Sequence, residues 1–199
     1  VEAVKNECAY MGFLAIRLLD AVQDVFFHNK KELIAEINET EAKIDDLHRA
    51  IKAYAEDIMQ AGISDDASTA LALYVGCSRN VERIADQGKK LIEYYAYRQN
   101  RPHDFSEQAL TELSGMYAEA HHAIVTALDG FINEDPAKAQ EVASIAGKLR
   151  GMEVELRNRH IQRLDRQECD PETGLVFVDI LGVIEHIGYH SNNLAKATI

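Results

Sequence analysis

The sequence is poor in the features that mark disulfide-bonded and membrane-spanning proteins. Its 199 residues contain no tryptophan, three prolines and three cysteines, at positions 8, 77 and 169. An odd number of widely spaced cysteines, with no C-x-x-C pattern, predicts free thiols in a reducing compartment. The longest strongly apolar run, residues 175–184, includes an aspartate. It is half of the about 20 residues that a membrane-spanning helix needs, so we expect no direct membrane span and no secretory signal in this chain.

Basic residues are also too few for a nucleic-acid partner. The chain has 33 aspartates and glutamates against 21 lysines and arginines, for a net charge of −12. A nucleic-acid-binding face needs a basic stripe, and the sequence shows none. We therefore expect no nucleic acid as a partner and a surface that attracts cations. The same acidity leaves no evident basic pocket for phosphate, so phosphate recognition would need a bound metal as a bridge.

What the chain does contain is helix-forming residues at helical spacing. Long stretches rich in Ala, Leu, Ile, Glu, Lys and Arg carry apolar residues three and four positions apart. Asp65 or Asp66, Ser106 and Asp135 are suited to cap helix N-termini, and Pro136 is suited to a first helical position. The pattern predicts six long helices, at about 2–27, 30–61, 66–99, 106–132, 136–166 and 173–197.

The second three helices repeat the first three at an offset of 103–105 residues. The stretch NVERIADQG at 80–88 and the stretch VIEHIGYHS at 183–191 both contain Glu-x-Ile followed by a small residue. Such self-similarity indicates an internal duplication, and no stretch shows the alternation of a β-strand. The expected fold class is all-α, with two antiparallel three-helix bundles side by side, residues 1–100 and residues 101–199.

Two pairs of acidic residues in the first half are candidate metal ligands: Glu41 with Asp45, and Glu82 with Asp86. Residues four apart share one helical face, about 6 Å from each other. Because the second and third helices run antiparallel about a turn near residue 63, Asp45 is expected opposite Glu82 and Glu41 opposite Asp86. Four carboxylates at one height repel one another unless a cation offsets them. Magnesium, calcium, manganese and iron ions accept such oxygen ligands.

A simpler interpretation of these acids stays open. Acids four apart on long helices usually face solvent, and Arg79, Arg83 and Lys89 are close enough in sequence to pair with them.

The second half of the chain changes most of the acidic pattern. Ala146 and Arg150 stand where the first half has Glu41 and Asp45, and Tyr189 replaces the second acid of the other pair. Of the four acids, only Glu82 has an acidic counterpart in the second half, which is Glu185. This pattern predicts an ion pair between Arg150 and Glu185 in place of a second metal.

The phrases ERIAD at 82–86 and ETEAKIDDL at 39–47, within the doubled three-helix pattern, resemble PhoU-like proteins. Residues 155–195 are most similar to the PhoU-like cytoplasmic domain attached to bacterial sodium/phosphate cotransporters, and the resemblance covers essentially the whole chain. It implies metal binding by Glu/Asp-x-x-x-Asp repeats on a pair of three-helix bundles. The positions that match the family's ligands are Glu41, Asp45, Glu82, Asp86, Glu185 and His190.

The function that this resemblance implies is regulation of phosphate transport without chemical turnover. The chain would be cytoplasmic, at the inner face of the plasma membrane. Its partner would be a phosphate transporter or its own transmembrane portion, with a homodimer as a further option. The metal would be a divalent or ferric ion: iron, magnesium, manganese or calcium. The alternatives are a stand-alone PhoU-type regulator, a carboxylate-bridged di-metal helical-bundle enzyme, and a metal-free dimerisation or adaptor domain.

Overall fold

The structure is a computed structural model that describes residues 1–101 and 104–198, and its long elements are all helices. No helix in these ranges is long and apolar enough to cross a membrane. Two short 3-10 segments follow α1 and α6: η1 (Lys31–Leu33) and η2 (Lys196–Thr198). The expected all-α class is confirmed. The six long helices are α1 (Glu2–His28), α2 (Ile34–Gln60), α3 (Asp65–Gln99), α4 (Glu107–Asn133), α5 (Pro136–Asp165) and α6 (Pro171–Ala195).

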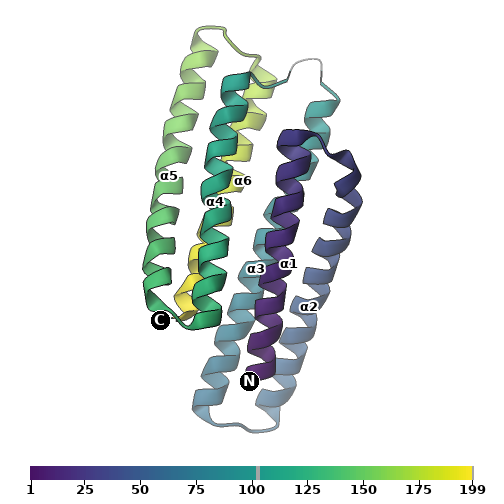
Figure 1. The fold of residues 1–199 in the computed structure, drawn as a ribbon, viewed down its shortest axis with the longest axis vertical. Helices are drawn as coiled ribbons and strands as arrows, with labels where there is room; N and C mark the ends of the chain where they lie inside the picture. Colours follow the sequence, from purple (N-terminus) through teal and green to yellow (C-terminus); the bar gives the residue numbers. More distant parts are fainter. Residues whose placement is uncertain (102–103, 199) are drawn as a thin grey trace.

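The helices form two three-helix bundles that lie side by side (Figure 1). Helices α1, α2 and α3 pack on one another, and so do α4, α5 and α6. The bundles meet where α3 packs against α6 and α1 against α4, whereas α2 and α5 lie on the outer flanks. The predicted arrangement of two neighbouring bundles is therefore confirmed.

The two bundles share one hydrophobic core. Met11 of α1 and Met116 of α4 are both fully buried in the same cluster of apolar side chains. The hydroxyl of Tyr117, on α4, donates a hydrogen bond of 2.7 Å to the carbonyl oxygen of Leu19, on α1. The ring of Tyr117 also lies edge-on to that of Phe27, with the centroids 5.8 Å apart. Because the core is continuous across the junction, the bundles hold each other in place.

Side-chain caps fix where most helices begin. Ser106 and Asp135 cap α4 and α5 by accepting a backbone N–H, as predicted. The prediction for α3 was wrong by one position, because Ser64 is the cap and Asp65 is the first helical residue. The acids at 65 and 66 instead lie in the first turn, where negative charge interacts favourably with the helix dipole. Asp170 caps α6, so this helix begins two residues earlier than expected.

One close approach sets the spacing of α1 and α3. A Cβ atom added to Gly88 would lie 2.5 Å from Cδ2 of Leu18 and 3.2 Å from Cδ2 of Leu19. A glycine at this position therefore lets α1 lie against the backbone of α3. Gly188 of α6 has the corresponding role toward α5, because a Cβ atom added there would clash with Cδ1 of Leu149.

Candidate metal centre

The acidic seam, defined as Glu41, Asp45, Glu82 and Asp86, lies between α2 and α3. The turn between these helices sets their register. Nδ1 of His48 on α2 lies 2.9 Å from Oγ of Ser78 on α3. Nζ of Lys89, further along α3, donates to Oε2 of Glu41 at 2.8 Å. These two contacts place the acids of α2 level with the stretch of α3 that contains Glu82 and Asp86.

Three carboxylates of the acidic seam affect one another. The pKa of Glu82 is raised, first because the side chain is largely buried and then because Asp86 and Asp45 are negatively charged and close. A hydrogen bond with Asp86 raises the pKa of Glu82 further, while Arg83 opposes the shift. Partial burial with like-charged neighbours is the environment in which a cation becomes favourable.

The cations nearest to these carboxylates belong to the protein itself. Arg83 lies between two acids, with Nε 3.5 Å from Oε2 of Glu82 and Nη1 3.5 Å from Oδ2 of Asp86. Arg49 lies 3.3 Å from Asp45, on its exposed side. Since Lys89 also pairs with Glu41, all four acids have a basic partner. The pairings that the sequence suggested for Arg83 and Lys89 are formed.

The acidic seam supplies suitable donors for a hard metal ion, but its side chains do not surround a common point. Within residues 1–101 and 104–198, no group of three or more His, Cys, Asp or Glu side chains is placed to hold a metal ion. Metal binding would therefore require Arg83 and Lys89 to leave the carboxylates, and it stays a prediction. Both are at the surface, with more than a third of each side chain exposed, so their rearrangement needs no change in the core.

The two predicted ligands of the second half face different neighbours. Glu185 lines a hollow of about 380 Å³ on the surface of α5 and α6, together with Arg150 and Arg157. The ion pair expected between Arg150 and Glu185 is not formed within 4.0 Å among the described residues, and Arg157 pairs with Glu153. The hollow is open enough to keep both charges hydrated, so nothing forces them together.

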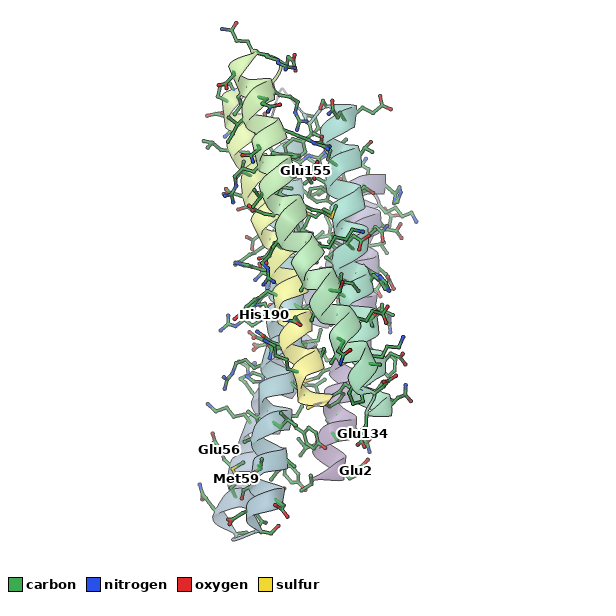
Figure 2. The ribbon with its side chains drawn as sticks, turned by 90° about the vertical axis from the view of Figure 1, so that its left-hand side faces the viewer. Glu2, Glu56, Met59, Glu134, Glu155 and His190 are labelled. Carbon is green, nitrogen blue, oxygen red and sulfur yellow. The ribbon has the colours of Figure 1, made fainter. Side chains whose placement is uncertain are left out.

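His190 points from α6 toward α3 and packs at the junction of the bundles (Figure 2). Its Nδ1 lies 3.1 Å from Oδ1 of Asn80. Burial lowers the pKa of His190 to about 4, with His186 and Arg83 as further causes. The imidazole is therefore neutral near pH 7, and its contact is with an amide, not with the acidic seam.

The contact between His48 and Ser78 was not predicted. The Ser78 hydroxyl donates to the carbonyl oxygen of Val75 at 2.9 Å, so Nδ1 of His48 must carry the proton that it shares with Oγ of Ser78. The only signal in the sequence was the Asp-x-x-His spacing of Asp45 and His48, which is common on helix surfaces. Ser78 is fully buried, so its Oγ offers His48 a fixed hydrogen-bond partner beside the acidic seam.

Comparison with known proteins settles the family. The sequence model of the PhoU domain family matches the chain twice, over residues 9–95 and 113–198. The chain belongs to the PhoU family. The two matches correspond to the two three-helix bundles, so the internal duplication read from the sequence is that of the PhoU domain.

Two curated PhoU relatives align with nearly the whole chain. The phosphate-specific transport system accessory protein PhoU homolog 1 of Thermotoga maritima is 25% identical over 199 residues, which covers 98% of this chain and 84% of that protein. The corresponding PhoU homolog of Zymomonas mobilis is 26% identical over 188 residues, which covers 94% of this chain and 78% of that protein. Both are named as accessory proteins, and neither name mentions a cotransporter.

Solved PhoU structures have the same fold. The crystal structure of PhoU from Pseudomonas aeruginosa superposes with a TM-score of 0.87 at 20% identity, covering 100% of this chain and 94% of that chain. The phosphate transport system regulatory protein PhoU from Streptococcus pneumoniae gives 0.83 at 14% identity, covering 99% and 92%. At this level of identity the likeness establishes the arrangement of the helices.

Proposed function

We propose that this chain regulates phosphate uptake as a PhoU-type accessory protein, by contact with a transport system and without chemical turnover. The observation that carries the proposal is the PhoU domain match over both bundles. The relatives named as accessory proteins of a phosphate-specific transport system support it, since the chain covers 84% and 78% of their lengths. These names favour a PhoU-type regulator over the cytoplasmic domain of a sodium/phosphate cotransporter. Contact with a transporter would place the protein at the inner face of the plasma membrane.

The test of this function is complementation. The chain is expressed in a bacterial strain that lacks its own PhoU homolog, and the uptake of labelled phosphate is followed in phosphate-rich medium. We expect uptake to fall toward the level of the parent strain. As a control, the same amount of protein carrying a proline at Ala120, a fully buried position in α4, should leave uptake unregulated because it cannot fold. Unchanged uptake with folded, well-expressed protein would contradict the proposal.

We also propose that the acidic seam binds a hard metal ion, through Asp45, Glu82 and Asp86 with Glu41 beside them. A bound ion would neutralise the carboxylates and tie α2 to α3. The raised pKa of Glu82 supports this, because its causes are burial first and then the nearby charges of Asp86 and Asp45, which a bound cation would offset. The oxygen donors suit magnesium, calcium, manganese or iron.

The metal proposal predicts a loss of ion binding when the two acids of α3 are made neutral. After chelator treatment and reloading with manganese or iron, the parent protein should retain the ion and melt about 5–10 °C higher at a 100-fold excess over its Kd. The Glu82→Gln/Asp86→Asn variant should bind at least tenfold more weakly. The control variant Glu56→Gln/Asp57→Asn removes the same charge from exposed positions on α2 and should bind as the parent does. Equal binding by all three proteins would rule out the acidic seam and leave the regulatory proposal standing.

A further inference from the structure

We propose that a hollow beside Arg98 binds a small oxyanion, with inorganic phosphate as the first candidate. The hollow has a volume of about 340 Å³ and lies where α1 and α3 end and the chain approaches α4. This volume is in the range of about 300–1,000 Å³ that is typical of small-molecule sites. The site is separate from the acidic seam, and only its link to phosphate regulation rests on the proposed function. Its lining residues are Phe26, Phe27, Asn29, Tyr95, Arg98, Gln99, Asp104 and Leu110.

The guanidinium of Arg98 contacts two aromatic rings and one carboxylate. Its Cζ lies 4.9 Å from the ring centroid of Phe26 and 4.7 Å from that of Phe105. Nε and Nη2 donate to the two carboxylate oxygens of Asp104, at 2.8 Å and 3.0 Å. The group is 92% buried, since only 8% of the residue is exposed. A guanidinium fixed in this way cannot turn to find another partner.

The remaining guanidinium nitrogen of Arg98, Nη1, is buried, and it has no hydrogen-bond acceptor among residues 1–101 and 104–198. A buried N–H of a charged group is normally paired, because burial removes its hydrogen bonds to water and an unpaired group gains no other hydrogen bond to compensate. An oxyanion in the hollow would supply an oxygen acceptor, and a carboxylate or phosphate oxygen makes the strongest hydrogen bonds with a guanidinium.

The other polar groups around the hollow also offer donors. The Tyr95 hydroxyl donates to Oδ1 of Asn29, which leaves the two N–H groups of the Asn29 amide available. Gln99 brings a second amide to the same lining. Asp104 is the one acidic side chain among the described lining residues, and its oxygens already accept from Arg98 and from the backbone N–H of Phe105. A hollow that has amide N–H donors and a carboxylate already neutralised by an arginine is suited to an oxyanion.

The backbone conformation at the end of α1 sets the position of the Asn29 side chain. Asn29 is the C-cap of α1 and has the left-handed conformation, with φ of 58° and ψ of 31°. Asparagine adopts this conformation more readily than most residues. Its backbone N–H donates to the carbonyl oxygen of Val25, and the backbone N–H of Lys30 donates to that of Asp24. The amide of Asn29 is thus presented by a helix end that is already satisfied.

Two features limit the affinity of the site. Helices α1 and α3 both end here, and helix C-termini carry partial negative charge. The chain as a whole has a net charge of −12. Both repel an anion at long range, so we expect binding in the millimolar range, with strong dependence on ionic strength. Such a site would respond to large changes in anion concentration and would be empty when the anion is scarce.

The test changes one atom of the hollow. Asn29→Asp keeps the shape, the left-handed conformation and the acceptor of the Tyr95 hydroxyl, but it replaces a donor with negative charge. Thermal melting of the full chain is measured against inorganic phosphate, acetate and chloride at equal ionic strength. For the parent we expect a saturable rise of about 3–5 °C at a tenfold excess of phosphate over its Kd. Asn29→Asp should bind phosphate at least tenfold more weakly.

Two further variants make the test decisive. Asn158→Asp adds the same charge at an exposed position in the C-terminal third of α5 and should bind as the parent does. Arg98→Lys keeps the charge but removes Nη1, and it should also lose binding; if it fails to fold, Asn29→Asp alone carries the test. A rise with phosphate alone identifies free phosphate as the ligand, and an equal rise with acetate identifies a site for small oxyanions in general. Equal shifts with chloride, or unchanged binding by Asn29→Asp, would overturn the proposal.

The outcome is separable from that of the proposed function. Phosphate uptake is measured in the complemented strain with the Asn29→Asp variant. If the variant has lost phosphate binding in the melting assay and phosphate no longer alters regulation, the hollow is the sensor. A protein that regulates uptake normally while Asn29→Asp and the parent bind phosphate equally would refute the hollow and retain the PhoU-type function.

Discussion

Replacing Arg163 by methionine is expected to lower the free energy of unfolding by about 3–5 kcal/mol. Arg163, on α5, forms two parallel hydrogen bonds with Glu112 of α4, at 3.0 Å and 2.9 Å. Only 12% and 8% of the two side chains are exposed. Methionine can keep the apolar contact that the arginine makes over the ring of Phe177, but Glu112 would be left buried and charged. Arg159 cannot replace the lost partner fully, since it approaches Glu112 only to 3.8 Å and lies near the surface.

The measurement is urea-induced unfolding at pH 7, followed by circular dichroism. A double variant, Arg163→Met/Glu112→Leu, should recover most of the lost stability, because it removes the unpaired charge together with its partner. Arg166→Met is the matched control: this arginine is 69% exposed and one turn away, and its removal should change the stability by less than about 0.5 kcal/mol. A loss below about 1 kcal/mol in Arg163→Met would show that water reaches Glu112.

The helices were predictable because their signals are local. Apolar residues at three- and four-residue spacing and caps such as Ser106 and Asp135 act within a few residues of each other, so a single sequence contains them. The error at the start of α3 has the same origin. Ser64, Asp65 and Asp66 can all cap a helix, and the choice depends on which of them adopts the extended conformation. Nothing in the three residues themselves decides it.

The acidic seam was predictable in position but not in its contacts. The register of α2 and α3 follows from the turn between them, so acids at matching distances from the turn had to lie at one height. Which cation neutralises them depends on long, flexible side chains, and Arg83 extends between Glu82 and Asp86 in this structure. Replacement of Arg83 by a metal ion depends on the free energy of metal binding relative to that of the ion pairs, and residue spacing does not determine this difference.

The hollow beside Arg98 could not be found from the sequence. Phe26 and Phe105, whose rings contact the guanidinium, come from α1 and from the segment before α4 and are far apart in the chain. Arg98 also looks like an ordinary basic residue at a helix C-terminus, where such residues favour the dipole. Its burial results from the packing of α1 and α3 against the segment that leads into α4, and only the assembled fold shows it.

His190 should make the folded protein lose stability in acid. Burial lowers the pKa of its imidazole from 6.5 to about 4, with His186 and Arg83 adding to the shift. The charged and titratable groups that face it are His186 and Tyr189 on α6 and Arg83 on α3. A folded-state pKa below the unfolded value means that the unfolded chain binds the proton first. Stability is therefore unaffected above about pH 7, falls as the pH drops from 6.5 to 4, and changes no further below that.

The size of this effect follows from the shift, at about 1.4 kcal/mol for each pKa unit. Since His190 keeps some contact with solvent, we expect a loss of about 2–3 kcal/mol between pH 7 and pH 4 that is specific to this residue. Other groups also titrate in this range, so the measurement is a difference between proteins. Urea unfolding is compared at pH 7 and pH 4 for the parent and for His190→Asn.

Asparagine is the suitable replacement because of the hydrogen bond that His190 makes. The amide nitrogen of Asn80 donates to the carbonyl oxygen of Gly76, so Oδ1 of Asn80 faces His190 and Nδ1 of the imidazole carries the proton. The amide of an asparagine at position 190 can donate to the same oxygen but cannot be protonated. Its stability should therefore fall less between pH 7 and pH 4 than that of the parent, whereas His122→Asn, at an exposed position, should behave as the parent does. Identical acid sensitivity in all three proteins would mean that the junction between α3 and α6 opens to water before His190 titrates.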